Sequence, residues 1–399
     1  MVDLSGFVQQ YDWGGKHFIP NFIGTKNEGG VPFAELWFGI HPKGPATVKG
    51  LDEELLAFLN KNPELLGRQV RTSFDGKLPF LLKILDVSDM LSIQAHPNRK
   101  EAEIGFAAEE AAGIPISASN RVFRDPNPKP EMMLALTDFW LLHGFKTIER
   151  IRKTLQSVQE LAALLPLANN IQNLYTNWMQ LPQEEVNVLL QPLQERLLSV
   201  TFPDKQRPEY WAKKALQTFR RANGDIDRGV LSIFIMNIVH LKPGEAIFQG
   251  SGILHAYLEG VNVELMANSD NVFRGGLTSK HIDVPALLGH IGYQSIIPDI
   301  RRGKAINAFE TVFSSEFPEF ELAMLKLTDT LGSWNHKNEE SLEIYLVLEG
   351  SVSANGQLKS EGAAFLLGAG EELLLRCEDS GGKAVLVRAY VPMKESKTP

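Results

Sequence analysis

The sequence contains a single cysteine, and this excludes several kinds of site. Cys377 is alone among 399 residues, so neither an internal disulfide nor a cysteine-ligated zinc site can form. No apolar stretch approaches the roughly 18 residues that a membrane-spanning helix needs. The longest one, Leu231–Val239, is interrupted by Asn237, and we expect it to be a buried strand. The N-terminus has no basic start followed by an apolar run, so we expect no signal peptide and a cytoplasmic protein.

The charge balance argues against nucleic acid as a partner. Lys and Arg number 40 against 48 Asp and Glu, which gives a net charge of −8 and no basic footprint. A phosphorylated ligand would therefore need a local cluster of cations. The sequence holds no P-loop, and the Gly-x-Gly at 250–252 lacks the third glycine of a dinucleotide-binding motif. We expect a small-molecule ligand, with neither nucleic acid nor membrane as partner, and a monomer.

The chain divides into three regions with different sequence patterns, which predict a mainly β protein with an α-helical insertion. Short apolar runs separated by Gly and Pro predict strands before residue 147 and after residue 229. The final hundred residues show the closely spaced strands and Gly-rich turns of a jelly roll. The predicted units are a catalytic domain, with its first part at 1–146 (including a short helix at 99–113) and its second at 230–290, a helical insertion at 147–229, and a C-terminal jelly roll at 291–399.

The helical insertion is predicted from a change of period. Beginning at Ile148, apolar residues recur every three or four positions, as in an amphipathic helix. Further helices are expected at 169–179, 183–200 and 208–222, with a kink or break at Pro192. The sequence pattern again predicts strand at Val230–Leu241.

A polar triplet marks the first candidate site. Ser92, Gln94 and His96 alternate with Ile93 and Ala95, and this period of two places the three polar groups on one face of a strand. Inside a fold, an unpaired amide or imidazole costs about 1–3 kcal/mol, so such a triplet needs partners. A metal ion would satisfy Gln94 and His96, whereas a half-exposed strand would turn the triplet toward solvent. From this segment alone both interpretations stand.

Two further segments offer ligands of matching chemistry. His255 and Tyr257 share the same spacing of two, and Glu131 begins a strongly apolar run, where an ionised carboxylate is rare unless paired or metal-bound. Two imidazoles, a carboxylate and an amide oxygen suit Zn²⁺. Three other histidines are set aside by context: His143 and His240 as structural residues, and His336 as an exposed residue of a polar loop.

Four cations supply what the acidic surface lacks. Arg274 and Lys280 flank a pair of glycines that lets a ligand approach the backbone closely. Lys83 interrupts an apolar strand, so it either reaches outward to water or points into a polar cavity. Lys129 precedes Glu131 by two residues. Together these residues predict a local site for a phosphate group.

At these residues the sequence resembles the type I mannose-6-phosphate isomerases (phosphomannose isomerases), of the cupin superfamily. The matching segments run in the family's order over nearly the whole chain. They are Tyr11–Gly14, Glu35–Trp37, His41-Pro42, Leu78–Leu81, Leu91–Asn98, Asp125–Asn127, Lys129–Glu131, His255–Tyr257 and Glu264–Lys280.

The resemblance implies a cupin-type catalytic β-barrel, an inserted helical domain and a C-terminal jelly roll. It also implies interconversion of mannose 6-phosphate and fructose 6-phosphate through a cis-enediol, feeding mannose and GDP-mannose metabolism. One zinc ion would be held by the residues that match the family's ligands: Gln94, His96, Glu131 and His255. Substrate contacts are predicted for Ser92, Lys83, Tyr257, Asp270 and Lys280.

One segment departs from the family. Before the carboxylate ligand the family usually reads Asn-His-Lys-Pro-Glu, but residues 127–131 read Asn-Pro-Lys-Pro-Glu. A role for that histidine in ring opening or proton transfer cannot be carried over to Pro128. Either the histidine was never essential, or its task has moved to Lys129, Asp270 or water.

Three catalytic residues are predicted, with alternatives left open. Arg274 would stabilise the enediolate, Lys129 is a candidate for proton transfer, and Glu264, flanked by Val263 and Leu265, would be the base if burial raises its pKa. A structural carboxylate bonded to Tyr257 or Lys129 is the alternative for Glu264. A cupin with these ligands is also compatible with an Fe(II) oxygenase or with a sugar-binding regulator that lacks catalysis.

Overall fold

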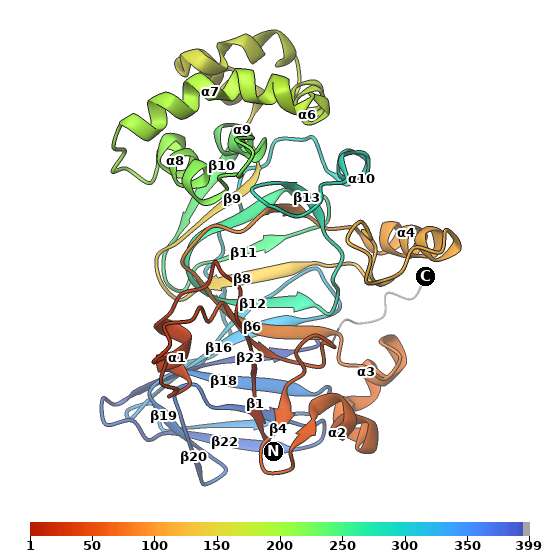
Figure 1. Cartoon of the computed structure of the whole chain (residues 1–399). Coiled ribbons are helices and arrows are strands. Elements are labelled where there is room, and N and C mark those ends of the chain that lie inside the picture. Colours follow the sequence, from red (N-terminus) through yellow and green to blue (C-terminus); the bar gives the residue numbers. More distant parts are fainter. Residues whose placement is uncertain (394–399) are drawn as a thin grey trace.

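The computed structural model describes residues 1–393, and it is built mostly of β-sheet with a layer of helices at one end (Figure 1). This confirms the predicted class, mainly β with a helical region. In this described part of the chain, no helix is long and apolar enough to cross a membrane.

A ten-stranded sheet occupies the middle of the molecule and carries the candidate site (Figure 1). Its main path runs β10-β9-β12-β6-β3-β2, and β7, β8, β11 and β13 pair beside it. These pairings do not close into a ring among the described residues, so the expected barrel is instead an open sheet. The strands are β2 (Phe7–Gln9), β3 (Glu35–Phe38), β6 (Phe80–Val87), β7 (Ile93–Ala95), β8 (Glu131–Ala135), β9 (Phe139–Phe145), β10 (Met236–Leu241), β11 (Ala246–Gln249), β12 (His255–Ala267) and β13 (Phe273–Gly276).

The C-terminal segment forms a nine-stranded and a four-stranded sheet, and three N-terminal strands complete the larger one. Its order is β14-β15-β16-β23-β18-β21-β1-β4-β5, and that of the smaller sheet is β17-β22-β19-β20. Strand pairing therefore crosses between the segments predicted as separate domains. The strands are β1 (Val2–Ser5), β4 (Thr47–Val48), β5 (Glu53–Glu54), β14 (Lys304–Ala305), β15 (Glu310–Phe313), β16 (Glu321–Thr328), β17 (Ser333–Lys337), β18 (Glu343–Glu349), β19 (Ser351–Ala354), β20 (Gln357–Ser360), β21 (Ala364–Leu367), β22 (Glu372–Cys377) and β23 (Lys383–Tyr390).

The helical layer lies where the change of period predicted it. One hydrophobic cluster joins its buried stripe to Ile93 and Ala95, the apolar face of β7. Pro192 does not break its helix, which runs on as α7. The helices of this layer are α5 (Ile148–Ser157), the 3-10 helix η2 (Gln159–Leu167), α6 (Ile171–Gln180), α7 (Gln183–Ser199), α8 (Pro208–Thr218) and α9 (Gly229–Ile235). Shorter or peripheral helices are α1 (Phe18–Phe22), α2 (Leu55–Lys61), η1 (Pro63–Leu66), α3 (Gly67–Ser73), α4 (Arg99–Ala111) and α10 (Val284–His290).

Two local predictions were wrong. The run Val230–Leu241 was expected to be one strand, but its first half is helix α9 and only Met236 onward is strand. Every residue of α9 is buried, so its apolar residues are not confined to one face. Such a run shows no periodicity that would distinguish a helix from a strand. His336 is not in an exposed loop: it lies half-buried in β17, where its Nε2 atom is 3.0 Å from both Glu343 Oε1 and Arg388 Nη1. The structural role expected for His240 agrees with its stacking on Trp140.

A bulge in β12 determines which residues face the site. The register between β12 and β9 shifts between Tyr257 and Glu259, and Gly260 next to it has a φ of 128°. A bulge adds one residue to a strand, so residues of opposite parity on its two sides face the same way. Tyr257 and Glu264 are therefore neighbours, and the Tyr257 hydroxyl donates to Glu264 Oε1 at 2.9 Å.

The packing of α7 allows a matched test. Leu190 is fully buried and Val188 is 72% exposed on the same helix. We expect Leu190→Ala to lower the free energy of unfolding by about 2–5 kcal/mol, because it leaves a cavity. Val188→Ala should change it by less than about 0.5 kcal/mol. Urea unfolding followed by circular dichroism measures both, and equal midpoints for the two variants would contradict this account of the helical layer.

Candidate metal centre

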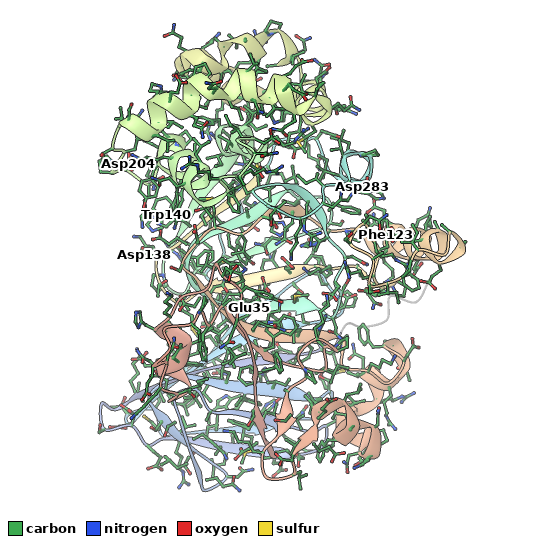
Figure 2. The ribbon with its side chains drawn as sticks, in the orientation of Figure 1. Glu35, Phe123, Asp138, Trp140, Asp204 and Asp283 are labelled. Carbon is green, nitrogen blue, oxygen red and sulfur yellow. The ribbon has the colours of Figure 1, made fainter. Side chains whose placement is uncertain are left out.

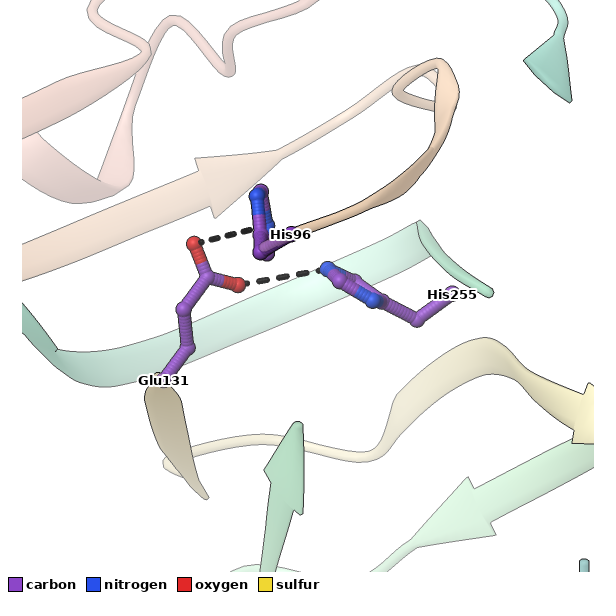
Figure 3. Close-up of side chains that lie close together, drawn as sticks. All are labelled: His96, Glu131 and His255. Carbon is purple, nitrogen blue, oxygen red and sulfur yellow. Dashed lines mark ion pairs between the residues drawn. The ribbon is translucent and has the colours of Figure 1, made fainter. Parts of the chain in front are cut away.

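Three buried side chains from distant parts of the chain converge on one point (Figure 3). His96 Nε2 lies 3.3 Å from Glu131 Oε1, and His255 Nε2 lies 3.2 Å from Glu131 Oε2. Their potential ligand atoms all lie within 4.8 Å of one another, and each side chain is 3% exposed or less.

Strand ends position these groups. His96 directly follows β7, Glu131 opens β8, and His255 opens β12. Gln94, in β7, is directly opposite His255 on one side and Arg274 of β13 on the other. Opposed residues of neighbouring strands present their side chains to the same face, so Gln94 shares a face with His255. The alternation predicted for this strand is confirmed by the burial of Ile93 and Ala95 in the core behind it.

Backbone carbonyls orient both imidazole rings. His96 Nδ1 lies 2.7 Å from the carbonyl oxygen of Asn271, and His255 Nδ1 lies 2.9 Å from that of Ile253. A carbonyl can only accept, so each Nδ1 carries a proton, and a neutral ring in this orientation presents its Nε2 lone pair to the centre. Both Nε2 atoms are buried without a hydrogen-bond partner.

Asn271 is a residue that sequence reasoning missed. Its side-chain oxygen accepts from the Arg124 amide at 2.7 Å, and its Nδ2 donates to the carbonyls of Asp125 and Asn127 at 2.8 and 2.9 Å. It therefore holds the loop that leads to Glu131, while its own carbonyl orients His96. Its place in the long Ala-Asn-Ser-Asp-Asn segment was the available signal, but nothing in the spacing named its partner.

Lys129 places a positive charge directly on the cluster. Its ammonium lies 2.9 Å from Glu131 Oε1 in a nearly dry environment. Burial alone would raise the pKa of Glu131, but Lys129 and then His96 hold that pKa well below its usual value. Burial, with the nearby charge of Lys129, lowers the pKa of His96 to about 4. At neutral pH the carboxylate is thus ionised and the His96 ring neutral, which are the forms that bind metals.

A second buried charge cluster lies beside the first, around Lys83. The Lys83 ammonium is buried, 3.0 Å from Glu264 and 3.2 Å from Glu35. Glu35 lies in the middle of the molecule (Figure 2). Trp37 donates its indole N–H to Glu35 at 2.6 Å. Burial raises the pKa of Glu264, against the opposing charge of Lys83. Glu264 thus receives hydrogen bonds from Tyr257 and Lys83, whereas Lys129 binds Glu131.

The remaining predicted residues differ in their contacts. Asp270 lies 2.7 Å from Lys43 and 3.5 Å from His41, and these contacts hold its pKa below the usual value although burial would raise it. Partial burial, and then the charges of Arg274, Lys43 and Arg124, lower the pKa of Lys280. Within residues 1–393 neither Arg274 nor Lys280 forms a side-chain ion pair. Ser92 is half-buried just before β7.

The three clustered residues fit a metal ion. Two ligand atoms that are each about 2.0–2.1 Å from a tetrahedral zinc lie about 3.3 Å apart. Each imidazole Nε2 lies at about this separation from a different oxygen of Glu131, at 3.3 Å for His96 and 3.2 Å for His255. Metal binding would also satisfy the two unpartnered Nε2 atoms, because leaving a buried acceptor without a partner costs folding free energy.

Comparisons with known proteins point to one family. Residues 1–148 match the model of the phosphomannose isomerase type I catalytic domain. Mannose-6-phosphate isomerase from Shigella flexneri is 39% identical over 74% of this chain and 75% of its own length. The mouse protein of that name is 31% identical over 94% of each chain.

Among similar solved structures, some contain zinc and one contains a sugar phosphate. The crystal structure of mannose 6-phosphate isomerase from Salmonella typhimurium, bound to fructose 6-phosphate and zinc, superposes with a TM-score of 0.86 at 32% identity, over 98% of this chain and 100% of that one. Another structure of a mannose 6-phosphate isomerase, also zinc-bound, has the same TM-score and identity. The family match, the sequence match over as much as 94% of the chain and these structures show that this chain belongs to the type I phosphomannose isomerase family.

Proposed function

We propose that this chain is a zinc-dependent aldose–ketose isomerase that interconverts mannose 6-phosphate and fructose 6-phosphate. The observation that carries the proposal is the convergence of His96, Glu131 and His255, with both ring lone pairs aimed inward. Family membership supports the reaction, and the relative that binds fructose 6-phosphate and zinc supports the substrate. We propose further that it acts as a cytoplasmic monomer and supplies mannose and GDP-mannose metabolism.

One zinc ion would be held by His96, Glu131, His255 and, as the fourth ligand, Gln94. The register of Gln94 opposite His255 supports its place in this set. Zinc bound here supplies a Lewis acid for the sugar oxygens.

Proton transfer needs a base beside the sugar. Isomerisation moves a proton between neighbouring carbons through a cis-enediol, so one group must take the proton and return it. Glu264 is our candidate because it is buried with a raised pKa and lies in one cluster with Lys83 and Tyr257. Its bond to Tyr257 equally supports the alternative of a structural carboxylate, and the exchange experiment below separates the two.

Charge stabilisation and substrate contacts fall to the surrounding residues. Arg274 carries a permanent positive charge that would stabilise the enediolate oxygen. It lies directly opposite Gln94 in the pairing of β13 with β7. Lys280 and Ser92 are assigned to the phosphosugar. The ammonium of Lys83 has three donors, of which Glu35 and Glu264 occupy two and one is left for a sugar oxygen.

Three further contacts complete the proposed binding site. Asp270, ionised between His41 and Lys43, would accept from a sugar hydroxyl. Tyr257, which donates to Glu264, would contact the same part of the sugar as that carboxylate. Lys129 is our candidate for proton transfer in place of the family's histidine at position 128, because its ammonium lies 2.9 Å from Glu131 Oε1.

Metal reconstitution tests the proposed function. The zinc-loaded protein should convert mannose 6-phosphate without consuming oxygen, and the metal-free protein should not. Glu131→Gln should bind zinc at least about 10–100-fold more weakly, since it removes the anionic ligand. Glu103→Gln, on the exposed face of α4, is the matched control. Oxygen-dependent turnover with iron would favour an oxygenase, and metal retention without turnover would favour a sugar-binding regulator; either result contradicts the proposal.

Exchange with heavy water tests the base. Glu264→Gln should slow deuterium incorporation into substrate by about 10²–10⁴-fold, the usual contribution of a general base. Tyr257→Phe is the comparison variant: it removes the hydrogen bond to Glu264 and leaves the carboxylate in place, so it should slow exchange much less than Glu264→Gln if Glu264 is the base. Mass spectrometry of the sugar phosphate measures both. Unchanged exchange in Glu264→Gln would show that another group is the base.

A further inference from the structure

The helical insertion (residues 147–229) touches the strand that carries Arg274 backbone to backbone. A side chain on Gly276 would place its Cβ 2.4 Å from the Cα of Gly229, and one on Gly229 would lie 2.6 Å from the amide nitrogen of Leu277. A Cβ on Gly275 would lie 2.9 Å from the hydroxyl of Tyr175 on α6. The close approach therefore requires glycine on both sides of this contact.

Asp227 fastens the two segments together at this contact. Its Oδ1 accepts from the amides of Gly229 at 2.7 Å and Leu277 at 2.8 Å, and its Oδ2 accepts from the amide of Thr278 at 3.2 Å. Arg221 adds a charged donor to Oδ2 at 3.3 Å. The carboxylate is 3% exposed, so these four donors satisfy it almost without water.

The backbone it holds is in an unusual conformation. Leu277 has a φ of 53° and Gly276 a φ of 127°, and L side chains rarely adopt the left-handed region. A leucine stays there only if its surroundings hold it. Asp227 provides that restraint, because it binds the amides of Leu277 and Thr278 with separate oxygens.

The segment Gly276–Thr278 separates two proposed substrate residues along the chain. Arg274 precedes it in β13 and Lys280 follows it, and the Lys280 amide donates to Thr278 Oγ1 at 3.1 Å. Any change of backbone at Leu277 moves one cation relative to the other.

We infer that Asp227 is a positioning residue through which the helical insertion fixes the spacing of Arg274 and Lys280 around the sugar phosphate. The inference rests on the proposed function, which assigns those two cations to the substrate. It gives the insertion a role in substrate binding, although Asp227 itself does not touch the substrate.

Asp227→Asn in the zinc-loaded full chain is the test. An asparagine keeps one acceptor oxygen, but its NH₂ group would meet Thr278 N–H and Arg221, which are both donors. We expect KM for mannose 6-phosphate to rise about ten-fold, because the two cations are misplaced, with a smaller change in kcat and an unchanged zinc content. Asp225→Asn is the matched control, since Asp225 lies two residues away and its side chain, among residues 1–393, bonds within the insertion to Asn187 and Asn223.

Hydrogen exchange provides a readout that does not depend on the substrate. Peptides covering residues 275–280 should exchange faster in Asp227→Asn than in Asp225→Asn. Should Asp227→Asn fail to fold, Arg221→Met leaves the carboxylate in place and removes the guanidinium that donates to Asp227 Oδ2 and to the Thr278 carbonyl. A smaller rise in KM with faster exchange in the same peptides is then expected. Unchanged KM and exchange in Asp227→Asn, or equal changes in the control, would overturn the inference. If the unaltered chain does not convert mannose 6-phosphate, the proposed function fails, while the exchange experiment still decides whether Asp227 holds the segment Gly276–Thr278.

Discussion

Two hydrogen bonds from imidazole rings to backbone carbonyls determine what the rest of the site can do. The Nδ1 protons of His96 and His255 are fixed by Asn271 and Ile253, so both Nε2 lone pairs face Glu131 in a dry interior. Without these bonds the rings would be free to turn, and the two Nε2 lone pairs would no longer converge with the Glu131 carboxylate on one point. The sheet brings the three groups together, and the carbonyls make the cluster a set of ligands rather than a buried polar defect.

The neighbouring charges are arranged so that each is satisfied by a named partner. Lys129 neutralises Glu131, and Lys83 lies between Glu35 and Glu264. Burying such charges is costly unless they are paired, so this arrangement is rigid. The bulge in β12 is what brings Glu264 into the same space as the metal cluster, and it links the sheet's geometry directly to the proposed chemistry.

The sequence predicted much of the site because its signals were local. The alternation around Gln94 and His96 placed both on one face of a strand, and the lone carboxylate in an apolar run pointed to Glu131. The positioning residues Asn271 and Asp227 could not be found this way. Each acts through hydrogen bonds to segments far away in the chain, and such partners are set only when the chain folds.

Elsewhere the limits of prediction have equally physical causes. The run at 230–235 is buried on all sides as helix α9, so it shows no periodicity, and the joining of β1, β4 and β5 to the C-terminal sheet leaves no mark in either segment alone. X-ray absorption at the zinc edge of the purified protein tests the central claim most directly. The account predicts one zinc per chain with two imidazole nitrogens and oxygen ligands at about 2.0–2.1 Å. A sulfur ligand, or a spectrum unchanged by substituting both His96 and His255, would contradict it.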